Sequence, residues 1–188
     1  MVAVSALWLP ILVAAVLVFV VSSIIHMVLG YHAGDYRAVP RQDDVQDALR
    51  RFQLGAGDYM LPKPRSMQEM NSPEFKAKYG KGPSLVMTVF PQGQNWMGVQ
   101  LATWFLYAVM VGVFTGYVAG ITLPAGAPYM TVFRVTGTVA FMGYALALFQ
   151  QSIWYQRRWT TTLISVFDGL IYGLLTAGAF GWLWPQVV

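Results

Sequence analysis

Residues 160–185 read TTTLISVFDGLIYGLLTAGAFGWLWP, an apolar stretch long enough to cross a lipid bilayer. Crossing the hydrocarbon core takes about 20 apolar residues, because a helix rises about 1.5 Å per residue. Pro185 and the tryptophans before it mark one end, since aromatic rings favour the headgroup level. The stretch contains a single acid, Asp168. We expect this acid to face other helices and not lipid, because a charge inside the membrane costs about 3 kcal/mol.

The composition of the whole chain is that of a membrane protein. Its 188 residues are 56% hydrophobic and 11% charged, with a mean hydropathy of +0.51. Soluble domains are about 25% charged. The chain has no cysteine, which excludes disulfides, thiol catalysis and iron–sulfur clusters. Hydrolase motifs and a nucleic-acid-binding pattern are both missing from the sequence, so we expect no nucleic-acid partner.

Three more stretches have the length and apolar character of membrane spans: residues 7–29, 96–121 and 130–153. The first is longer than the core of a signal peptide, so we expect it to be retained. The sequence therefore predicts an all-α membrane protein of four transmembrane helices. Residues 1–29 form the first helix, and residues 96–188 form the other three, which pack against it.

A polar insert, residues 30–95, separates the first two spans and holds nine of the twelve Lys and Arg and seven of the eight acids. Residues 42–53 predict an amphipathic helix, and residues 59–61 and 84–90 predict short paired strands. A helix is predicted to begin at residues 72–74 and to end at Gly80. The insert is therefore predicted to be a small α+β element that packs on the membrane surface or on a partner. The apolar face of the first of these helices consists of Val45, Ala48, Leu49 and Phe52.

The placement of basic residues predicts the orientation. Four crossings put both termini on one side, and the insert and the turn at residues 154–159 on the other. That second side holds eleven of the twelve basic residues, including Arg157 and Arg158. The positive-inside rule then makes the insert cytoplasmic and both termini periplasmic. The short turn is the stronger indicator, because the insert is near the rule's length limit of about 60 residues.

Asp168 is the sharpest candidate for a functional residue. By helical rise it lies about 12 Å from the cytoplasmic end of its helix, and His26 lies within about two turns of that depth. An intramembrane polar cluster of these side chains could hold a proton or an ion, or contact a lipid headgroup or a quinone. Alternatively, Asp168 is a buried carboxylate that holds the bundle in register through hydrogen bonds. Three amides at similar depth complete the candidate cluster: Gln100, Gln150 and Gln151.

Other polar residues have simpler interpretations. Arg134 lies about 20 Å from Asp168 along the membrane normal, so we expect it to anchor at the outer headgroups or to bind the carbonyls of the turn at residues 122–129. We predict no metal site at His26, His32 and Asp35, because a spacing of six puts the two histidines on different helix faces, Gly30 is expected to end the helix between them, and no cysteine is available. Basic side chains could contact lipid or a partner, or simply be solvated: Lys76, Lys78, Lys81, Arg157 and Arg158.

Glycines at intervals of four predict where helices pack closely, because they let a neighbouring backbone approach. The second span carries three of them and the fourth span two: Gly112, Gly116, Gly120, Gly169 and Gly173.

Several motifs resemble an uncharacterised family of small bacterial inner-membrane proteins. They are Tyr31-His32-x-x-Asp35-Tyr36 after His26, Gly57-Asp58-Tyr59-Met60-Leu61-Pro62, Phe167-Asp168-Gly169-Leu170-Ile171-Tyr172 and Phe180-Gly181-Trp182-Leu183-Trp184-Pro185. The resemblance covers the whole chain. It implies a membrane location and a bacterial origin, and no activity.

Three classes of function follow from these patterns. The lack of a convergent catalytic set favours a non-enzymatic accessory or assembly subunit of a larger membrane complex, whether respiratory, photosynthetic or transport. Its partners would be the lipid bilayer and other membrane subunits. The alternatives are a small proton- or ion-linked transporter or channel that uses Asp168 and His26, and an intramembrane enzyme that acts on lipid or quinone. No cofactor is predicted, although a bound lipid or quinone is compatible with the cluster.

Overall fold

The computed structural model describes residues 1–93 and 97–186. Within these ranges, four helical segments are long and apolar enough to cross a membrane: Val4–Met27, Met97–Thr122, Tyr129–Trp154 and Trp159–Trp182. The prediction of four such helices is confirmed, with ends that differ by a few residues. The chain forms two compact units, one of residues 1–36 and 96–188 and the other of residues 37–95.

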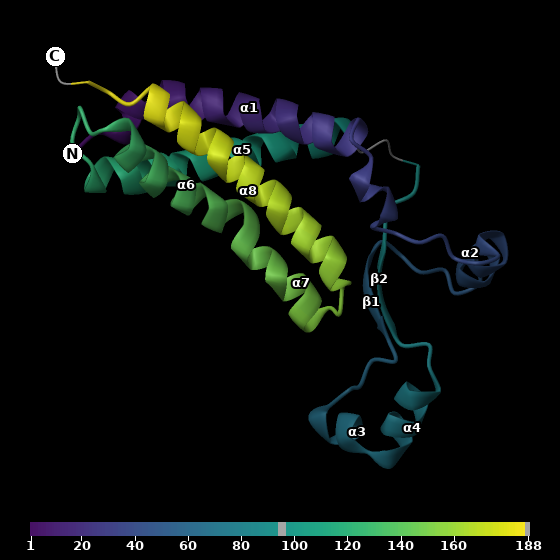
Figure 1. Cartoon of the computed structure of the whole chain (residues 1–188). Coiled ribbons are helices and arrows are strands. Elements are labelled where there is room, and N and C mark those ends of the chain that lie inside the picture. The colour runs from purple at the N-terminus through teal and green to yellow at the C-terminus, as the bar shows by residue number, and fades with distance from the viewer. Residues whose placement is uncertain (94–96, 187–188) are drawn as a thin grey trace. The chain divides into compact units, whose positions relative to one another are not determined.

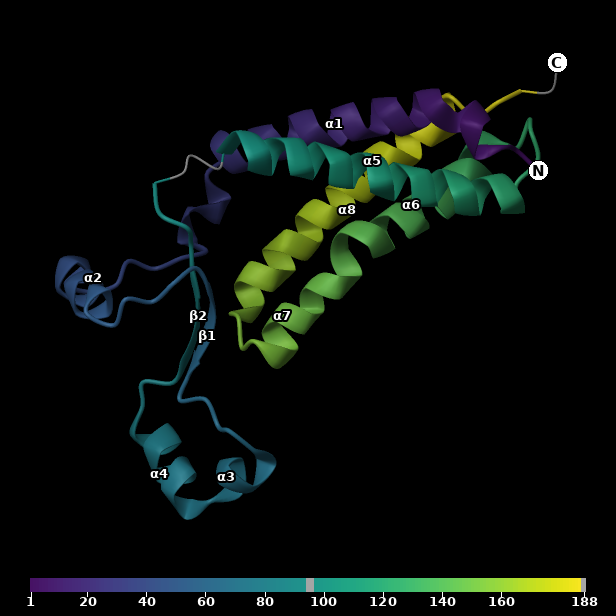
Figure 2. The same cartoon turned by 180° about the vertical axis from the view of Figure 1, so that it is seen from behind.

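The first unit is a helical bundle (Figures 1 and 2). Helix α6 packs most extensively on α8, while α1 packs on both α8 and α5, and α5 packs on α6. The elements of the bundle are η1 (Val4–Leu7), α1 (Trp8–Met27), η2 (Tyr31–Gly34), α5 (Met97–Thr122), α6 (Tyr129–Ala145), η3 (Leu146–Leu148), α7 (Phe149–Trp154) and α8 (Trp159–Trp182).

The third span is divided, whereas the sequence predicts one helix over residues 130–153. Helix α6 ends at Ala145, the 3-10 turn η3 follows, and α7 completes the segment. The interruption coincides with a side-chain bond to the helix backbone, because the Tyr107 hydroxyl donates to the Gly143 carbonyl at 2.6 Å. That carbonyl would accept the amide of Ala147 in a regular helix. A side chain that inserts into the hydrogen-bond ladder is an established cause of a break.

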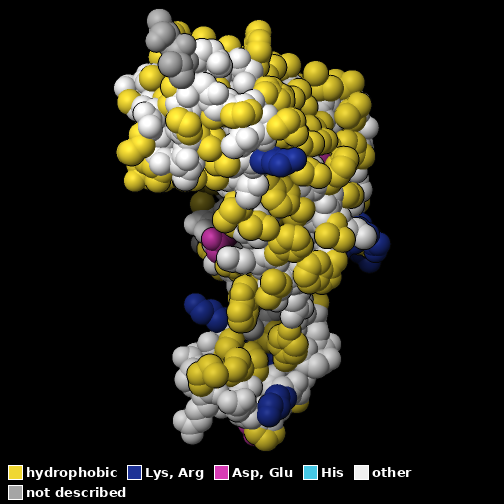
Figure 3. Space-filling model, turned by 60° about the vertical axis from the view of Figure 1, so that its left-hand side comes forward, with side chains coloured by type: hydrophobic (Ala, Val, Ile, Leu, Met, Phe, Trp, Pro, Cys, Tyr) yellow, Lys and Arg dark blue, Asp and Glu magenta, His cyan; other side chains and the backbone are white. Residues whose placement is uncertain are grey.

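Small and apolar side chains fill the interior of the bundle. One buried cluster surrounds Leu7, Val132 and Phe180, and a second surrounds Val18 and Tyr144. The outer surface is also apolar, and Figure 3 shows hydrophobic side chains over most of the bundle face in view. Small residues between helices and large apolar residues outside are typical of helices that pack within lipid.

One end of the bundle is closed by hydrogen bonds among three parts of the chain. The Val2 amide donates to the Gly120 carbonyl at 2.8 Å, and the Gly126 amide donates to the Pro185 carbonyl at 2.8 Å. The Trp184 indole nitrogen donates to the Pro124 carbonyl at 2.9 Å. The segments next to both termini therefore lie at the same end of the bundle as the α5–α6 turn.

The second unit contains a two-stranded antiparallel sheet, as the sequence predicts, and three helices. Its strands pair from Gly57 opposite Val89 to Leu61 opposite Leu85. Its elements are α2 (Gln42–Arg50), β1 (Gly57–Leu61), α3 (Met67–Asn71), α4 (Pro73–Lys81) and β2 (Leu85–Val89).

The helix boundaries of the insert differ from the predicted ones. Helix α2 ends at Arg50, three residues before the predicted end. Gly80 lies inside α4, which ends one residue later because Gly82 takes the positive φ of +62° that favours glycine. Helix α3 was not predicted; it begins where the Ser66 side chain accepts a hydrogen bond from the Glu69 amide at 3.1 Å.

Candidate functional site

A chain reversal after the first span brings two polar side chains to Asp168. Helix α1 ends at Met27, and Gly30 adopts a left-handed φ of +65°, which favours glycine. The chain then turns into η2, whose first residues are Tyr31 and His32. Asp168 is the tenth residue of α8, so it lies about 14 Å along the helix from its start.

Both oxygens of the Asp168 carboxylate are hydrogen-bonded. The side chain is almost fully buried, with 3% of the residue exposed. Its Oδ1 accepts from the Tyr31 hydroxyl, and its Oδ2 lies 2.8 Å from Nε2 of His32. Nδ1 of His32 lies 2.8 Å from Oδ2 of Asp35. His32 therefore bridges the buried carboxylate of Asp168 and the half-buried carboxylate of Asp35.

Burial and the neighbouring carboxylates together shift the pKa of both η2 side chains. Burial lowers the pKa of His32, but the hydrogen bonds to Asp35 and Asp168 and their negative charges outweigh it, so the net pKa is raised. Desolvation of the inward-facing hydroxyl, together with the bond to Asp168 and its charge, raises the pKa of Tyr31 to about 12. Tyr31 therefore stays protonated at neutral pH and donates to Asp168.

His26 completes the cluster. It is exposed in the last turn of α1, and its Nδ1 lies 3.1 Å from the Ser22 carbonyl oxygen. Its ring stacks on that of His32, with centroids 4.4 Å apart and an interplanar angle of 18°. The potential ligand atoms of His26, His32 and Asp168 all lie within 4.8 Å of one another. The prediction that the two histidines lie apart is wrong, because α1 ends at Met27 and the chain reverses at Gly30 between them.

The cluster differs in membership from the predicted one. Gln100, Gln150 and Gln151 are all exposed, and the hydrogen bonds of Asp168 within the described part of the chain go to η2. The bonds of Tyr31 and His32 to Asp168, and the bond of Asp35 to His32, were not predicted from the sequence. The available signal was Gly30 directly after the first span, because a glycine there permits a tight reversal.

Arg134 lies elsewhere, exposed on α6. Over residues 1–93 and 97–186 its side chain has no hydrogen bond or ion pair, so bonds to the carbonyls of the 122–129 turn are not formed. Its role as an anchor at the outer headgroups stays a prediction.

The five glycines with the predicted spacing all lie at contacts with another segment. A Cβ on Gly112 would lie 3.1 Å from the Ile11 side chain, and one on Gly120 would overlap the Val2 carbonyl oxygen. A Cβ on Gly116 would lie 3.4 Å from the Phe180 ring. On α8, the equivalent atoms would lie 2.8 Å from Ala145 for Gly169 and 3.2 Å from the Phe141 amide for Gly173.

The basic side chains occupy two units. Lys76, Lys78 and Lys81 are exposed on α4. Arg157 is half-buried in the turn before α8, whereas Arg158 is exposed and its Nη1 lies 3.4 Å from the Gly34 carbonyl oxygen. Arg158 therefore contacts the end of η2 within the bundle unit.

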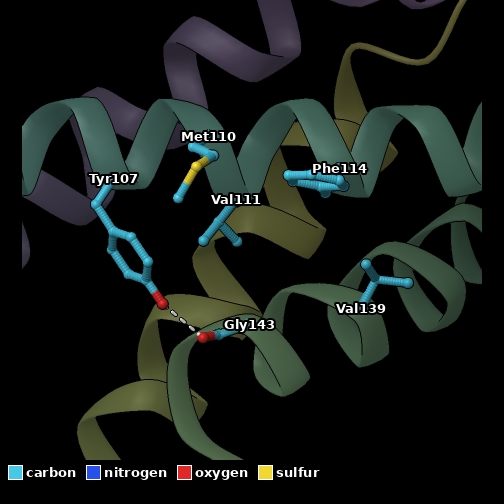
Figure 4. Close-up of a pocket in the computed structure, with 6 residues that line it drawn as sticks. All are labelled: Tyr107, Met110, Val111, Phe114, Val139 and Gly143. Atoms are coloured by element: carbon cyan, nitrogen blue, oxygen red, sulfur yellow. Dashed lines mark hydrogen bonds between the residues drawn. The ribbon is translucent and has the colours of Figure 1, made fainter. Parts of the chain in front are cut away.

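A pocket of about 270 Å³ lies between α5 and α6 (Figure 4). Its lining is apolar, and the Gly143 carbonyl in it is already bonded to the Tyr107 hydroxyl. Such a lining suits a hydrocarbon chain of a lipid or quinone better than a polar headgroup. The pocket is lined by Tyr107, Met110, Val111, Phe114, Val139 and Gly143.

Comparison of this chain with models of protein families, with curated proteins and with solved structures finds no match. The likeness to small bacterial inner-membrane proteins therefore stays a prediction from the sequence, and function has to be argued from the residues themselves.

Proposed function

We propose that this chain is a non-enzymatic integral membrane protein that serves as an accessory or assembly subunit of a larger bacterial membrane complex. The part that binds the partner subunit is the insert, residues 37–95. The observation that carries this proposal is the burial within the insert: of its described residues, 37–93, Pro62 alone is buried.

The insert exposes apolar side chains from helices and strand ends alike. Phe52, Met67 and Phe90 are exposed by 71%, 69% and 74%, and Val45 and Leu49 on the apolar face of α2 by 40% each. A two-stranded sheet is marginally stable in water by itself, and a segment this short needs a core to offset its conformational entropy. Contacts with another surface would supply the missing apolar burial.

The charge of α2 favours a protein over the membrane surface as that contact. Helices that lie on membranes carry mainly Lys and Arg on their polar face, which attracts anionic lipid. Helix α2 carries Asp43, Asp44 and Asp47, and two of these acids are paired locally, Asp44 with Arg41 and Asp47 with Arg50. With the arginines at its two caps, its polar face has no excess of positive charge to attract anionic headgroups, while its apolar face suits a partner subunit.

The polar cluster of the bundle has a role in the same proposal. The chain enters the insert only a few residues after Tyr31 and His32, which are both hydrogen-bonded to the buried Asp168. These bonds hold η2, the last element of the bundle unit before the insert, on α8. A buried carboxylate that accepts bonds from two side chains is well suited to such a structural joint.

The proposal is tested by co-purification in a mild detergent. The wild-type chain is expected to migrate with larger subunits. The double variant Leu49→Ser and Phe52→Ser is expected to migrate without them, because the apolar contact with the partner subunit is lost. Gln46→Ser on the same helix is the matched control and should keep the complex. A wild-type chain that migrates only as a monomer or a small homo-oligomer would contradict the proposal.

The proposed orientation, with the insert in the cytoplasm and both termini in the periplasm, is tested separately. The chain has no cysteine, so a single introduced cysteine is the only thiol. A membrane-impermeant maleimide should label Gln68→Cys in inside-out vesicles and Ala3→Cys in right-side-out vesicles. The opposite labelling would reverse the orientation.

A further inference from the structure

We propose that His26, His32 and Asp168 form a binding site for one divalent first-row transition-metal ion, with Zn²⁺ as the reference ion. This site goes beyond the accessory role, which needs only the hydrogen bonds of the cluster. Three observations carry it: the donor types, the hydrogen bonds behind each donor, and the distances among the donor atoms.

The donor set fits such an ion. Two imidazoles and one carboxylate are a recurrent protein ligand set for Zn²⁺, and they leave a further position for water or substrate. Mg²⁺ and Ca²⁺ prefer oxygen donors alone, so two imidazoles disfavour them. The chain contains two histidines, and both lie in this cluster. The ring nitrogens available to a metal are therefore all in one place.

A hydrogen bond behind each donor would orient it. Histidines that bind metals usually donate their second ring N–H to a carboxylate or a backbone carbonyl. Nδ1 of His32 lies 2.8 Å from Asp35, and Nδ1 of His26 lies 3.1 Å from the Ser22 carbonyl oxygen. Both Nε2 atoms are thereby left for the ion. The Tyr31 hydroxyl similarly holds Oδ1 of Asp168 and leaves Oδ2 facing His32.

The donor atoms are close enough for an ion to draw them together. Ligands that bind Zn²⁺ at about 2.1 Å lie about 3–3.5 Å from one another. Nε2 of His32 and Oδ2 of Asp168 are 2.8 Å apart, and one potential ligand atom from each of the three residues lies within 4.8 Å of the other two. The remaining movement toward the ion would be made by the ring of His26, which is exposed in the last turn of α1 and can rotate.

The site also balances charge. A divalent ion would bind Asp168 directly and would interact with the negative charge of Asp35 across the His32 ring, so two carboxylates would compensate its two positive charges. Metal would replace the direct bond between His32 and Asp168. The Tyr31 and Asp35 contacts would remain in place.

The test measures Co²⁺ and Zn²⁺ binding to the full chain, purified without a polyhistidine tag in mild detergent and freed of metal with a chelator. Co²⁺ reports the coordination by its visible absorption, and Zn²⁺ is measured by competition with a chromophoric chelator. Wild type is expected to bind one ion. His26→Gln and His32→Gln are expected to weaken binding by more than about 100-fold, and Asp35→Asn by about 10–100-fold, as for other residues behind a ligand.

Asp43→Asn on α2 is the control, because it removes an exposed acid far along the chain from the site. His26→Gln is the most informative variant, since its exposed ring has one hydrogen bond, to the Ser22 carbonyl, among the residues that the structure describes. The proposal is overturned if wild type binds neither ion, or if all variants bind as wild type does. Loss of binding at His26 with an unchanged melting temperature would support it, whether or not the chain joins a complex.

Discussion

Replacing Gly169 by alanine is expected to destabilise the bundle at its most extensive helix contact. A Cβ on Gly169 would lie 2.8 Å from the Ala145 Cβ and 3.3 Å from the Tyr144 carbonyl carbon. Carbon atoms of packed side chains lie about 3.5–4.0 Å apart, so α6 and α8 would have to separate locally. The obstructing atoms belong to a backbone and a Cβ, which cannot move away by changing rotamer.

The magnitude follows from two opposing terms. Overpacking of a well-packed contact costs about 1–3 kcal/mol, while replacing a helical glycine by alanine gains about 1 kcal/mol. Gly178 on the same helix is the matched control, because a Cβ there meets only the Tyr129 hydroxyl at 4.0 Å. Gly178→Ala is therefore expected to be neutral or slightly stabilising. The difference in unfolding free energy between the two variants isolates the packing term of about 1–3 kcal/mol.

The assay is reversible unfolding in mixed micelles by a denaturing detergent, followed by far-ultraviolet circular dichroism. Gly169→Ala should unfold at a lower denaturant fraction than Gly178→Ala, with the same helical content beforehand. If the two variants unfold together, within about 0.5 kcal/mol, the inference that α6 and α8 are in rigid contact at Gly169 is wrong.

Two further predictions concern the polar cluster. Tyr31→Phe removes one of the two hydrogen bonds to buried Asp168 and is expected to lower the unfolding free energy by about 1–2 kcal/mol. The control is Tyr36→Phe, which should change the unfolding free energy by less than about 0.5 kcal/mol because Tyr36 is 83% exposed. Equal stability of the two variants would show that the bond from Tyr31 to Asp168 does not stabilise the bundle. If the chain instead transports ions through Asp168, Asp168→Asn should abolish ion flux in proteoliposomes while the chain stays folded, and unchanged flux would exclude Asp168 from transport.

Local patterns in the sequence predicted much of the fold. Four stretches of sufficient apolar length identify the spans, because the cost of exposing backbone and polar groups to lipid acts on each segment separately. The strands of the insert follow in the same way from alternation and turn residues, and they pair as predicted. The break after Ala145 was not predicted, because it coincides with a hydrogen bond from Tyr107 on another helix.

The candidate site was predicted only in part. Depth along the helices put His26 near Asp168, and it put the exposed glutamines there as well, because depth says nothing about the direction in which a side chain points. The hydrogen-bond partners of the Asp168 carboxylate, Tyr31 and His32, lie beyond the end of the first span. Depth within the spans therefore says nothing about these two residues.

The sequence by itself determined that the chain has four apolar helices and one acid within them, since length and composition are properties of consecutive residues. The tertiary structure decided what that acid touches. Asp168 and His32 are 136 positions apart, and they meet because the chain reverses at Gly30 while α8 packs beside α1. Contacts of that kind depend on which helices become neighbours, and a linear pattern does not contain that information.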